Sequence, residues 1–300
     1  VFPLLAEALQ DRTLSVGEPY FERMGAPIGI ALLFLMAVGP LLPWRATSGA
    51  VMRDRLLIPA WVGGITLAVA VAFGARGVSQ VLTFALAGFA LASIARTVAI
   101  GIGARRRANR ESIPVAGVRM VRGNPRLYGG LLVHVGVVSI AVAIAASSGY
   151  TTKREVELAR GESATVRGFT VTYLGPELEQ SDQKTTVKAR VAVSRGGDSL
   201  GTYAPSISSY PGFGSGIGTP SVRTGLVRDL YLTLISSPTA DARVTLGVQV
   251  NPMVLWLWIG GLLMALGTAV ALLPVKRAPV LDRAHDEPAT ADPDLVEVTT

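Results

Sequence analysis

The stretch Asn124-Pro125-Arg126-Leu127-Tyr128-Gly129-Gly130-Leu131-Leu132-Val133-His134-Val135-Gly136 begins as a basic loop and continues to Ser148 as an apolar segment. The apolar part is long enough for a helix that crosses a bilayer, which needs about 20 residues. It contains one imidazole, that of His134. An ionisable group inside the bilayer is costly and usually has a function. The stretch therefore predicts a membrane helix that carries a functional side chain.

Composition indicates a membrane protein, because 50% of the 300 residues are hydrophobic and only 16% are charged. The net charge of +7 raises the question of a nucleic-acid partner. The arginines argue against it, because they cluster between apolar segments as cytoplasmic loops do. These clusters contain Arg45, Arg53, Arg55, Arg105, Arg106, Arg107, Arg110, Arg119, Arg122 and Arg126. The expected partner of the basic loops is the lipid bilayer, with no nucleic acid.

Cysteine is absent, so the chain can form no disulfide and supply no thiolate ligand or thiol nucleophile. The chain starts at Val1, and residues 1–9 are mostly apolar. We interpret residues 1–23 as the end of an earlier helix and an outer linker, so that the chain is part of a longer product. A short amphipathic start is the alternative.

Residues 24–148 are expected to form four transmembrane helices joined by basic cytoplasmic loops. The helices are predicted at 24–44, 56–73, 79–102 and 127–147, with loops at 45–55 and 103–126. Arg96 lies inside the third span. It is expected to extend toward the cytoplasmic headgroups or, alternatively, to pair with an acidic group such as a haem propionate.

Residues 149–251 differ in character, because β-branched residues alternate with polar ones in segments such as 164–173 and 186–193. This alternation with a period of two residues predicts short antiparallel strands. The Gly-, Ser- and Pro-rich segment 203–220 is predicted to be a long loop. Residues 252–274 are the last transmembrane helix and 275–300 a disordered cytoplasmic tail. The predicted fold is a membrane all-α bundle of about five transmembrane helices with an inserted extracytoplasmic β-rich domain.

His134 and His285 are the two histidines of the chain. His285 lies in the polar tail and is expected to be solvated. His134 lies roughly seven residues into its span, about 10 Å deep at the rise of an α-helix. It could bridge two helices by hydrogen bonds or bind a metal or haem iron. Gly130 lies one turn before it on the same helix face and leaves room for a flat macrocycle, with Val138 and Ala141 beyond.

Other chemistries have little support. No carboxylate lies within a predicted span, which argues against a proton relay, and no Gly-rich phosphate loop is present. Ser206, Ser208 and Ser209 have no extracytoplasmic histidine to activate them, which excludes a Ser-His-Asp triad. No catalytic residue can be assigned, and a second histidine for haem iron must come from another segment or subunit.

Several motifs resemble the C-terminal half of the CcmF-type cytochrome c haem lyase family. They are Asn124-Pro125-Arg126, Tyr128-Gly129-Gly130 and His134-Val135-Gly136; Thr219-Pro220 with Arg228-Asp229-Leu230-Tyr231; Pro252, Trp256, Trp258, Gly260-Gly261, Met264 and Gly267; and the segments 15–21 and 39–45. Together they cover nearly all of the chain except the tail.

The resemblance implies a protein of the bacterial inner membrane that takes haem from a haem chaperone. The family attaches this haem to the two cysteines of the Cys-x-x-Cys-His motif of apocytochrome c. A second, b-type haem in the membrane is thought to keep the substrate haem reduced, and the resemblance makes His134 one of its axial ligands. The other ligand belongs to the N-terminal half, so this chain alone should be inactive.

The resemblance also suggests that the β-rich domain docks a thiol-reductase subunit or the haem chaperone. Arg228 and Asp229 are expected to form a local ion pair, and Trp256 and Trp258 to lie at the membrane interface. The competing hypothesis is a non-enzymatic membrane anchor that presents the β-rich domain to a partner protein. In that case His134 only packs between helices.

Overall fold

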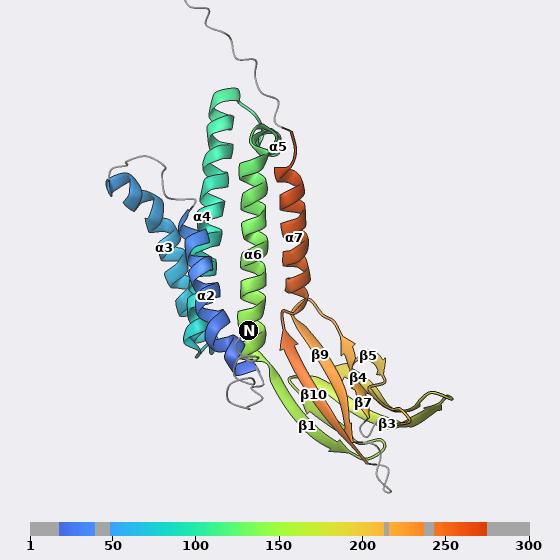
Figure 1. Ribbon diagram of the computed structural model, residues 1–300. Helices are drawn as coiled ribbons and strands as arrows, with labels where there is room; N and C mark the ends of the chain where they lie inside the picture. Colours follow the sequence, from blue (N-terminus) through green and yellow to red (C-terminus); the bar gives the residue numbers. More distant parts are fainter. Residues whose placement is uncertain (1–17, 40–48, 213–215, 237–242, 275–300) are drawn as a thin grey trace, which may run out of the picture.

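The chain forms a bundle of long helices that stands on one end of a β domain (Figure 1). The computed structural model describes residues 18–39, 49–212, 216–236 and 243–274, and their side chains except those of 18–22 and 50–52. The predicted tail 275–300, the start of the linker and residues 40–44 of the first predicted span lie outside these ranges. A membrane bundle with a β-rich domain is the fold that the sequence predicts.

Six helices occupy the described part of the bundle: α2 Glu18–Val38, α3 Gly49–Ala72, α4 Val78–Asn109, α5 Ile113–Gly123, α6 Pro125–Tyr150 and α7 Leu255–Ala271. Within the described ranges, three stretches are long and apolar enough to cross a membrane, namely Arg53–Ala72, Val78–Asn109 and Pro125–Tyr150. Arg23–Val38 and Leu255–Ala271 are shorter apolar helices. These five apolar helices correspond to the five predicted spans.

The predicted loop 103–126 is mostly helical. α4 continues to Asn109, and α5 follows after a short connection that contains Glu111. α5 lies across the end of the bundle that is opposite the β domain (Figure 1). It is amphipathic, since it buries Ala116 and Met120 against the bundle and exposes basic side chains.

Glu111 ties α4 to α5 by pairing with an arginine of each helix. Arg119 Nη1 donates to Glu111 Oε1 at 2.7 Å, and Arg105 Nε lies 3.5 Å from Glu111 Oε2. The Glu111 side chain is only 6% exposed. The hydrogen bond from Arg119, with the nearby charges of Arg105 and Arg119, holds the pKa of Glu111 below its ordinary value. The most basic part of the chain is therefore ordered around one carboxylate.

α6 and α7 approach each other backbone to backbone through glycines. A Cβ added at Gly136 would lie 2.6 Å from the Gly260 carbonyl oxygen, and one at Gly260 would lie 2.8 Å from the Gly136 carbonyl oxygen. Gly129, about two turns before Gly136 on α6, and Gly267, about two turns after Gly260 on α7, make the same kind of contact. Only residues without a side chain permit this spacing, as is common between membrane helices.

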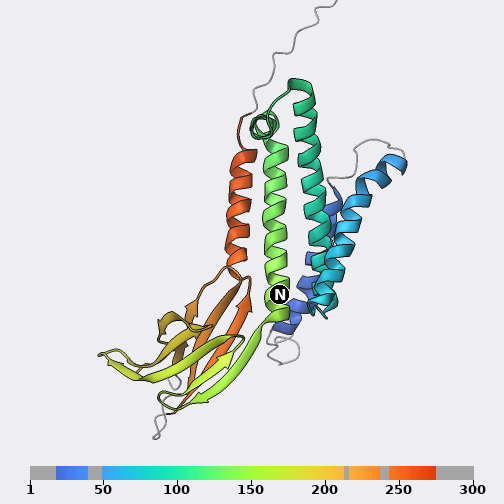
Figure 2. The same cartoon turned by 180° about the vertical axis from the view of Figure 1, so that it is seen from behind.

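The other side of α6 packs against α2 and α4. Val138 of α6 lies in a buried cluster with Leu33 and Ala37 of α2 and Ala87 and Ala90 of α4. α6 is therefore the central helix, with α4 on one side and α7 on the other in both views (Figures 1 and 2).

In the described residues of the β domain, ten antiparallel strands form two sheets. Its strands are β1 Thr152–Leu158, β2 Ser163–Val166, β3 Phe169–Gln180, β4 Thr185–Arg195, β5 Asp198–Tyr203, β6 Ser206–Ser209, β7 Ile217–Thr219, β8 Ser221–Arg223, β9 Arg228–Ser236 and β10 Val244–Pro252. One sheet has the order β1-β10-β9-β8; the other has the order β2-β3-β4-β6-β7, with β5 paired to β4. Alternate residues of both sheets, such as Phe169, Val191, Leu232 and Leu246, form one buried core.

Two predictions for the β domain need correction. The segment 203–220, predicted to be a loop, contains β6 and β7, which pair with each other and link to β4. No ion pair joins Arg228 to Asp229 among the described side chains. Successive strand residues point to opposite faces, and the buried Asp229 carboxylate instead accepts the Gly225 N–H at 2.9 Å.

The bundle and the β domain are joined by a continuous antiparallel pair. α6 leads into β1, β10 leads into α7, and β1 pairs with β10 from Thr152–Val250 to Leu158–Val244. The start of α7 is also tied to the loop before β9, because Trp256 Nε1 donates to the Leu226 carbonyl oxygen at 3.0 Å. The helix pair and the strand pair therefore hold each other in place.

We expect Gly260→Val to disrupt the packing of α6 against α7. The new side chain would meet Ile140 and the backbone of Gly136, and such overpacking typically costs about 1–3 kcal/mol. Gly261→Val is the matched control, because a Cβ there has no atom within 4 Å. Thermal unfolding of the detergent-purified protein should show a lower Tm for Gly260→Val only. Equal Tm values for the two variants would contradict this packing.

We expect the Glu111 pairing to make stability depend on pH. Because the pKa of Glu111 is lowered in the folded chain, its contribution is present at pH values above the ordinary pKa of 4.5 and is lost as the pH falls below that value. The Tm difference between wild type and Glu111→Gln should therefore shrink when unfolding is measured at successively lower pH. Glu155→Gln, at an exposed position of β1, should show no such trend. A difference independent of pH would contradict the role of the carboxylate charge.

Candidate haem-ligand site in the helix bundle

Three consecutive residues at the start of α6 set its rotation, because successive residues of an α-helix point about 100° apart. Tyr128 packs against α4 and α5, since a Cβ added at Gly101 would lie 2.6 Å from the Tyr128 hydroxyl and 2.7 Å from Met120 Sδ. Gly129 faces α7. Gly130 faces neither, because a Cβ added there meets no atom within 4 Å.

His134 lies one turn beyond Gly130, as the sequence predicts. Its ring makes no hydrogen bond within the described part of the chain. Nδ1 is completely buried without a partner, whereas Nε2 is not enclosed. A hydrogen bond that bridges two helices is therefore missing among these residues. The imidazole therefore lies one turn from Gly130, with a buried Nδ1 that no described residue satisfies.

The open space next to His134 extends along a shorter part of α6 than the sequence suggests. Val138 and Ala141, placed beyond His134 on the same helix face, pack against the cluster formed with α2 and α4. Open space next to His134 is shown at Gly130, where a Cβ would meet no atom within 4 Å. This arrangement has room for the edge of a planar group on the α5 side of His134.

At this site, the His134 imidazole is the one side chain among the described residues that we identify as a possible metal ligand. They contain no group of three or more His, Cys, Asp or Glu side chains that could hold a metal ion, and His285 lies outside the described ranges. Arg96 forms no ion pair within the described chain. α4 extends thirteen residues beyond Arg96, to Asn109, or about 20 Å at 1.5 Å per residue. Arg96 is therefore deeper in its helix than the predicted span implies.

The serines considered as nucleophiles, Ser206, Ser208 and Ser209, lie in or at the end of strand β6, and none has a histidine of the β domain to activate it. Ser206 and Ser208 are buried, and the Ser208 hydroxyl lies 2.9 Å from the Thr186 hydroxyl across β4 and β6. No histidine is described in this domain. The structure thus offers no activated serine here.

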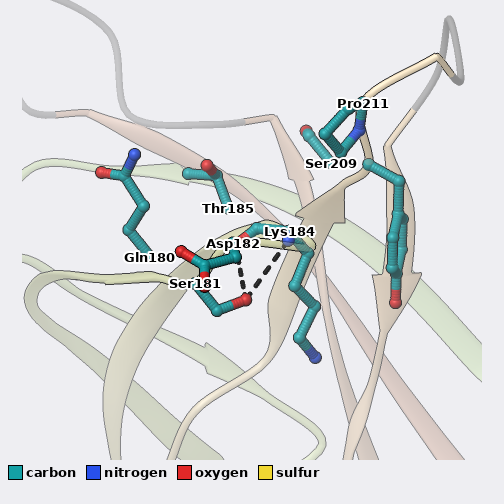
Figure 3. Close-up of a pocket in the computed structure, with 8 residues that line it drawn as sticks. Gln180, Ser181, Asp182, Lys184, Thr185, Ser209 and Pro211 are labelled. Carbon is teal, nitrogen blue, oxygen red and sulfur yellow. Dashed lines mark hydrogen bonds between the residues drawn. The ribbon is translucent and has the colours of Figure 1, made fainter.

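Two cavities could not be found from sequence. The first, of about 790 Å³, lies at the tip of the β3–β4 hairpin and is lined by polar residues, including Gln180, Asp182, Lys184 and Ser209 (Figure 3). Its hairpin turn is closed by Ser181, whose N–H donates to the Lys184 carbonyl oxygen at 2.9 Å. The second, of about 540 Å³, lies where the helices meet the β domain. Both combine segments far apart in sequence, so no local pattern predicts them.

Comparison with known proteins places this architecture in a family. Residues 149–252 match the model of the CcmF C-terminal beta-sandwich. The chain is 32% identical over 276 residues to a cytochrome c-type biogenesis protein CcmF of Pseudomonas aeruginosa, covering 91% of this chain and 40% of that protein. It is 31% identical over 289 residues to the cytochrome c-type biogenesis protein ccl1 of Rhodobacter capsulatus, with the same coverage of each.

A solved structure agrees with these relatives. The chain superposes on a structure described as "Cytochrome c Heme Lyase CcmF" with a TM-score of 0.68 and 28% identity, covering 91% of this chain and 42% of that one. The chain therefore spans about two fifths of the length of the curated relatives that it matches. It is similar to the CcmF family of cytochrome c-type biogenesis proteins, and the match lies in the C-terminal part of its members.

Proposed function

We propose that this chain is part of a cytochrome c haem lyase and that His134 is an axial ligand of a b-type haem in the membrane. The observation that carries the proposal is the His134 ring, which has no hydrogen-bond partner among the described residues and lies one turn from the open space at Gly130. A solved relative is named a cytochrome c haem lyase. Neutral imidazole is a common axial ligand of haem iron.

The residues around His134 fit one edge of a haem. Gly130 leaves room for the macrocycle, and the packing of Tyr128 and Gly129 holds the α6 rotation that directs the ring to this side. The buried Nδ1 requires a hydrogen-bond acceptor from outside the described residues, since ligating histidines almost always donate their second N–H. The second axial ligand also comes from outside this chain, from the N-terminal half of the protein. A bound b-type haem would supply one-electron reduction of the substrate haem.

We place the protein in the bacterial inner membrane with the α5 end in the cytoplasm. The arginines of α4 and α5 gather at that end, and the β domain lies at the other (Figure 1). Short loops rich in arginine stay on the cytoplasmic side. The β domain is then extracytoplasmic, where apocytochrome c is matured. There it provides a docking surface for the haem chaperone or the thiol-reductase subunit, and thioether bonds form when both halves of the lyase are present.

His134→Ala should remove or alter the six-coordinate b-type absorbance spectrum of the complete protein, both halves present, because one axial bond is lost. His285→Ala is the matched control, since it removes the other histidine of the chain and should leave the spectrum unchanged. Mature cytochrome c should fall in parallel with the spectrum. A wild-type spectrum for His134→Ala would overturn the ligand assignment and leave the membrane-anchor hypothesis.

Gly130→Leu should lower the haem content without lowering the Tm. A Cβ at this position meets no atom within 4 Å, so we expect the larger side chain to extend into the space proposed for the macrocycle with little cost to protein packing. The haem-to-protein ratio from the pyridine haemochrome spectrum checks this, with Gly261→Leu as the control at a second glycine with open space. Equal haem ratios in the two variants would place the macrocycle elsewhere.

A further inference from the structure

The cavity of about 540 Å³ lies where three membrane helices meet both sheets of the β domain. One face of α3 forms its apolar wall, with residues at helical spacing. The lining consists of Thr66, Val69 and Ala70 of α3, Phe73 directly after it, Phe84 of α4, Ala146 and Tyr150 of α6, and Arg167, Val227, Arg228, Val250, Pro252 and Met253 of the β domain. It is separate from the segment around Gly130 and His134, which lies nearer the α5 end of α6.

Two guanidinium groups of the β domain border this cavity. Arg167 lies in the β2–β3 turn, and Arg228 begins β9. Neither has a carboxylate within ion-pair distance among the described residues. Arg167 Nε donates to the Thr152 hydroxyl at 2.9 Å, which leaves its terminal nitrogens available. Two uncompensated cations beside an apolar wall call for an anion.

Arg167 occupies its position at a conformational cost. Its φ is +51° and that of Gly168 is +84°, so the pair forms a turn of the kind that favours Asn, Asp or Gly at its first position. A long cationic side chain is unfavourable in this left-handed conformation. Residues held in such conformations tend to gather at ligand sites.

The cavity is amphipathic along the membrane normal. From Phe73 to Thr66 it follows α3 for seven residues, or about 10 Å into the bundle at 1.5 Å per residue. Phe73 is 80% exposed and Val69 is 48% exposed, so the apolar wall opens outward from the bundle. Tyr150 closes the inner side, where its hydroxyl donates to the Ala70 carbonyl oxygen at 3.5 Å. The cationic end thus lies at headgroup depth and the apolar end in the hydrocarbon.

We propose that this cavity binds an anionic phospholipid, with its phosphate between Arg167 and Arg228 and an acyl chain along α3. Arginine binds phosphate oxygens with paired, charge-assisted hydrogen bonds. The wall of α3 and α6 matches an acyl chain, which a water-soluble anion lacks. A lipid held here contacts both sheets and three helices, so it fastens the β domain to the bundle. The site is independent of haem.

The test is native mass spectrometry of the detergent-purified full chain titrated with phosphatidylglycerol. Arg167→Gln combined with Arg228→Gln should weaken binding about tenfold or more, because two charged hydrogen-bond donors are lost. Arg154→Gln, which removes an exposed arginine of β1 outside the cavity, should bind as wild type does. Far-UV circular dichroism and size exclusion establish that the variants are folded.

Val69→Trp tests the apolar wall with both arginines intact. The indole would fill the cavity from an exposed position, so phosphatidylglycerol binding should fall although the charge is unchanged. Inorganic phosphate alone should not raise the Tm of the wild type. Added to the complex with phosphatidylglycerol, it should not displace the lipid. Unchanged lipid binding in the double arginine variant or in Val69→Trp would overturn the proposal. If inorganic phosphate raised the Tm as much as phosphatidylglycerol does, the proposal would also be overturned, in favour of a site for a free anion.

Discussion

The close contact of α6 with α7 through glycine backbone is the constraint on which the rest of the structure depends. Gly129 and Gly136 of α6 meet Gly267 and Gly260 of α7 at distances that no side chain allows. In lipid the hydrophobic effect does not drive helices together, so close van der Waals packing must do so. Since the helix cannot rotate without moving a side chain into this contact, the direction of every other α6 residue follows from it.

That rotation gives each part of α6 a separate role. Tyr128 reaches α4 and α5, Val138 enters the cluster with α2 and α4, and Gly130, one turn before His134, borders open space. The same two helices continue into β1 and β10, whose ladder extends the pairing beyond the membrane helices. One antiparallel unit therefore positions both the imidazole and the β domain. A ring with a buried, unpartnered nitrogen is costly in such a setting, and that cost supports the proposal that a group outside the described residues completes the site.

Much of this arrangement could be predicted from sequence, because hydrophobic length and period-two alternation are local signals. The apolar helices, the β-rich domain and the place of His134 one turn after Gly130 all follow from them. α5 was not predicted, because the arginines around it masked a short amphipathic helix. β6 and β7 were not predicted either, because Gly, Ser and Pro weaken the alternation even where the backbone still pairs. The supposed pair of Arg228 and Asp229 fails because adjacent strand residues face opposite sides, and the junction cavity depends on tertiary contacts that no local pattern contains.

The most direct measurement is a cryo-electron microscopy map of the complete protein with its native cofactor bound. The account predicts a planar macrocycle with its iron bonded to His134, its edge in the open space beside Gly130 and its second ligand from the other half of the protein. A map in which protein side chains cover His134 and Gly130, with the macrocycle elsewhere, would contradict it.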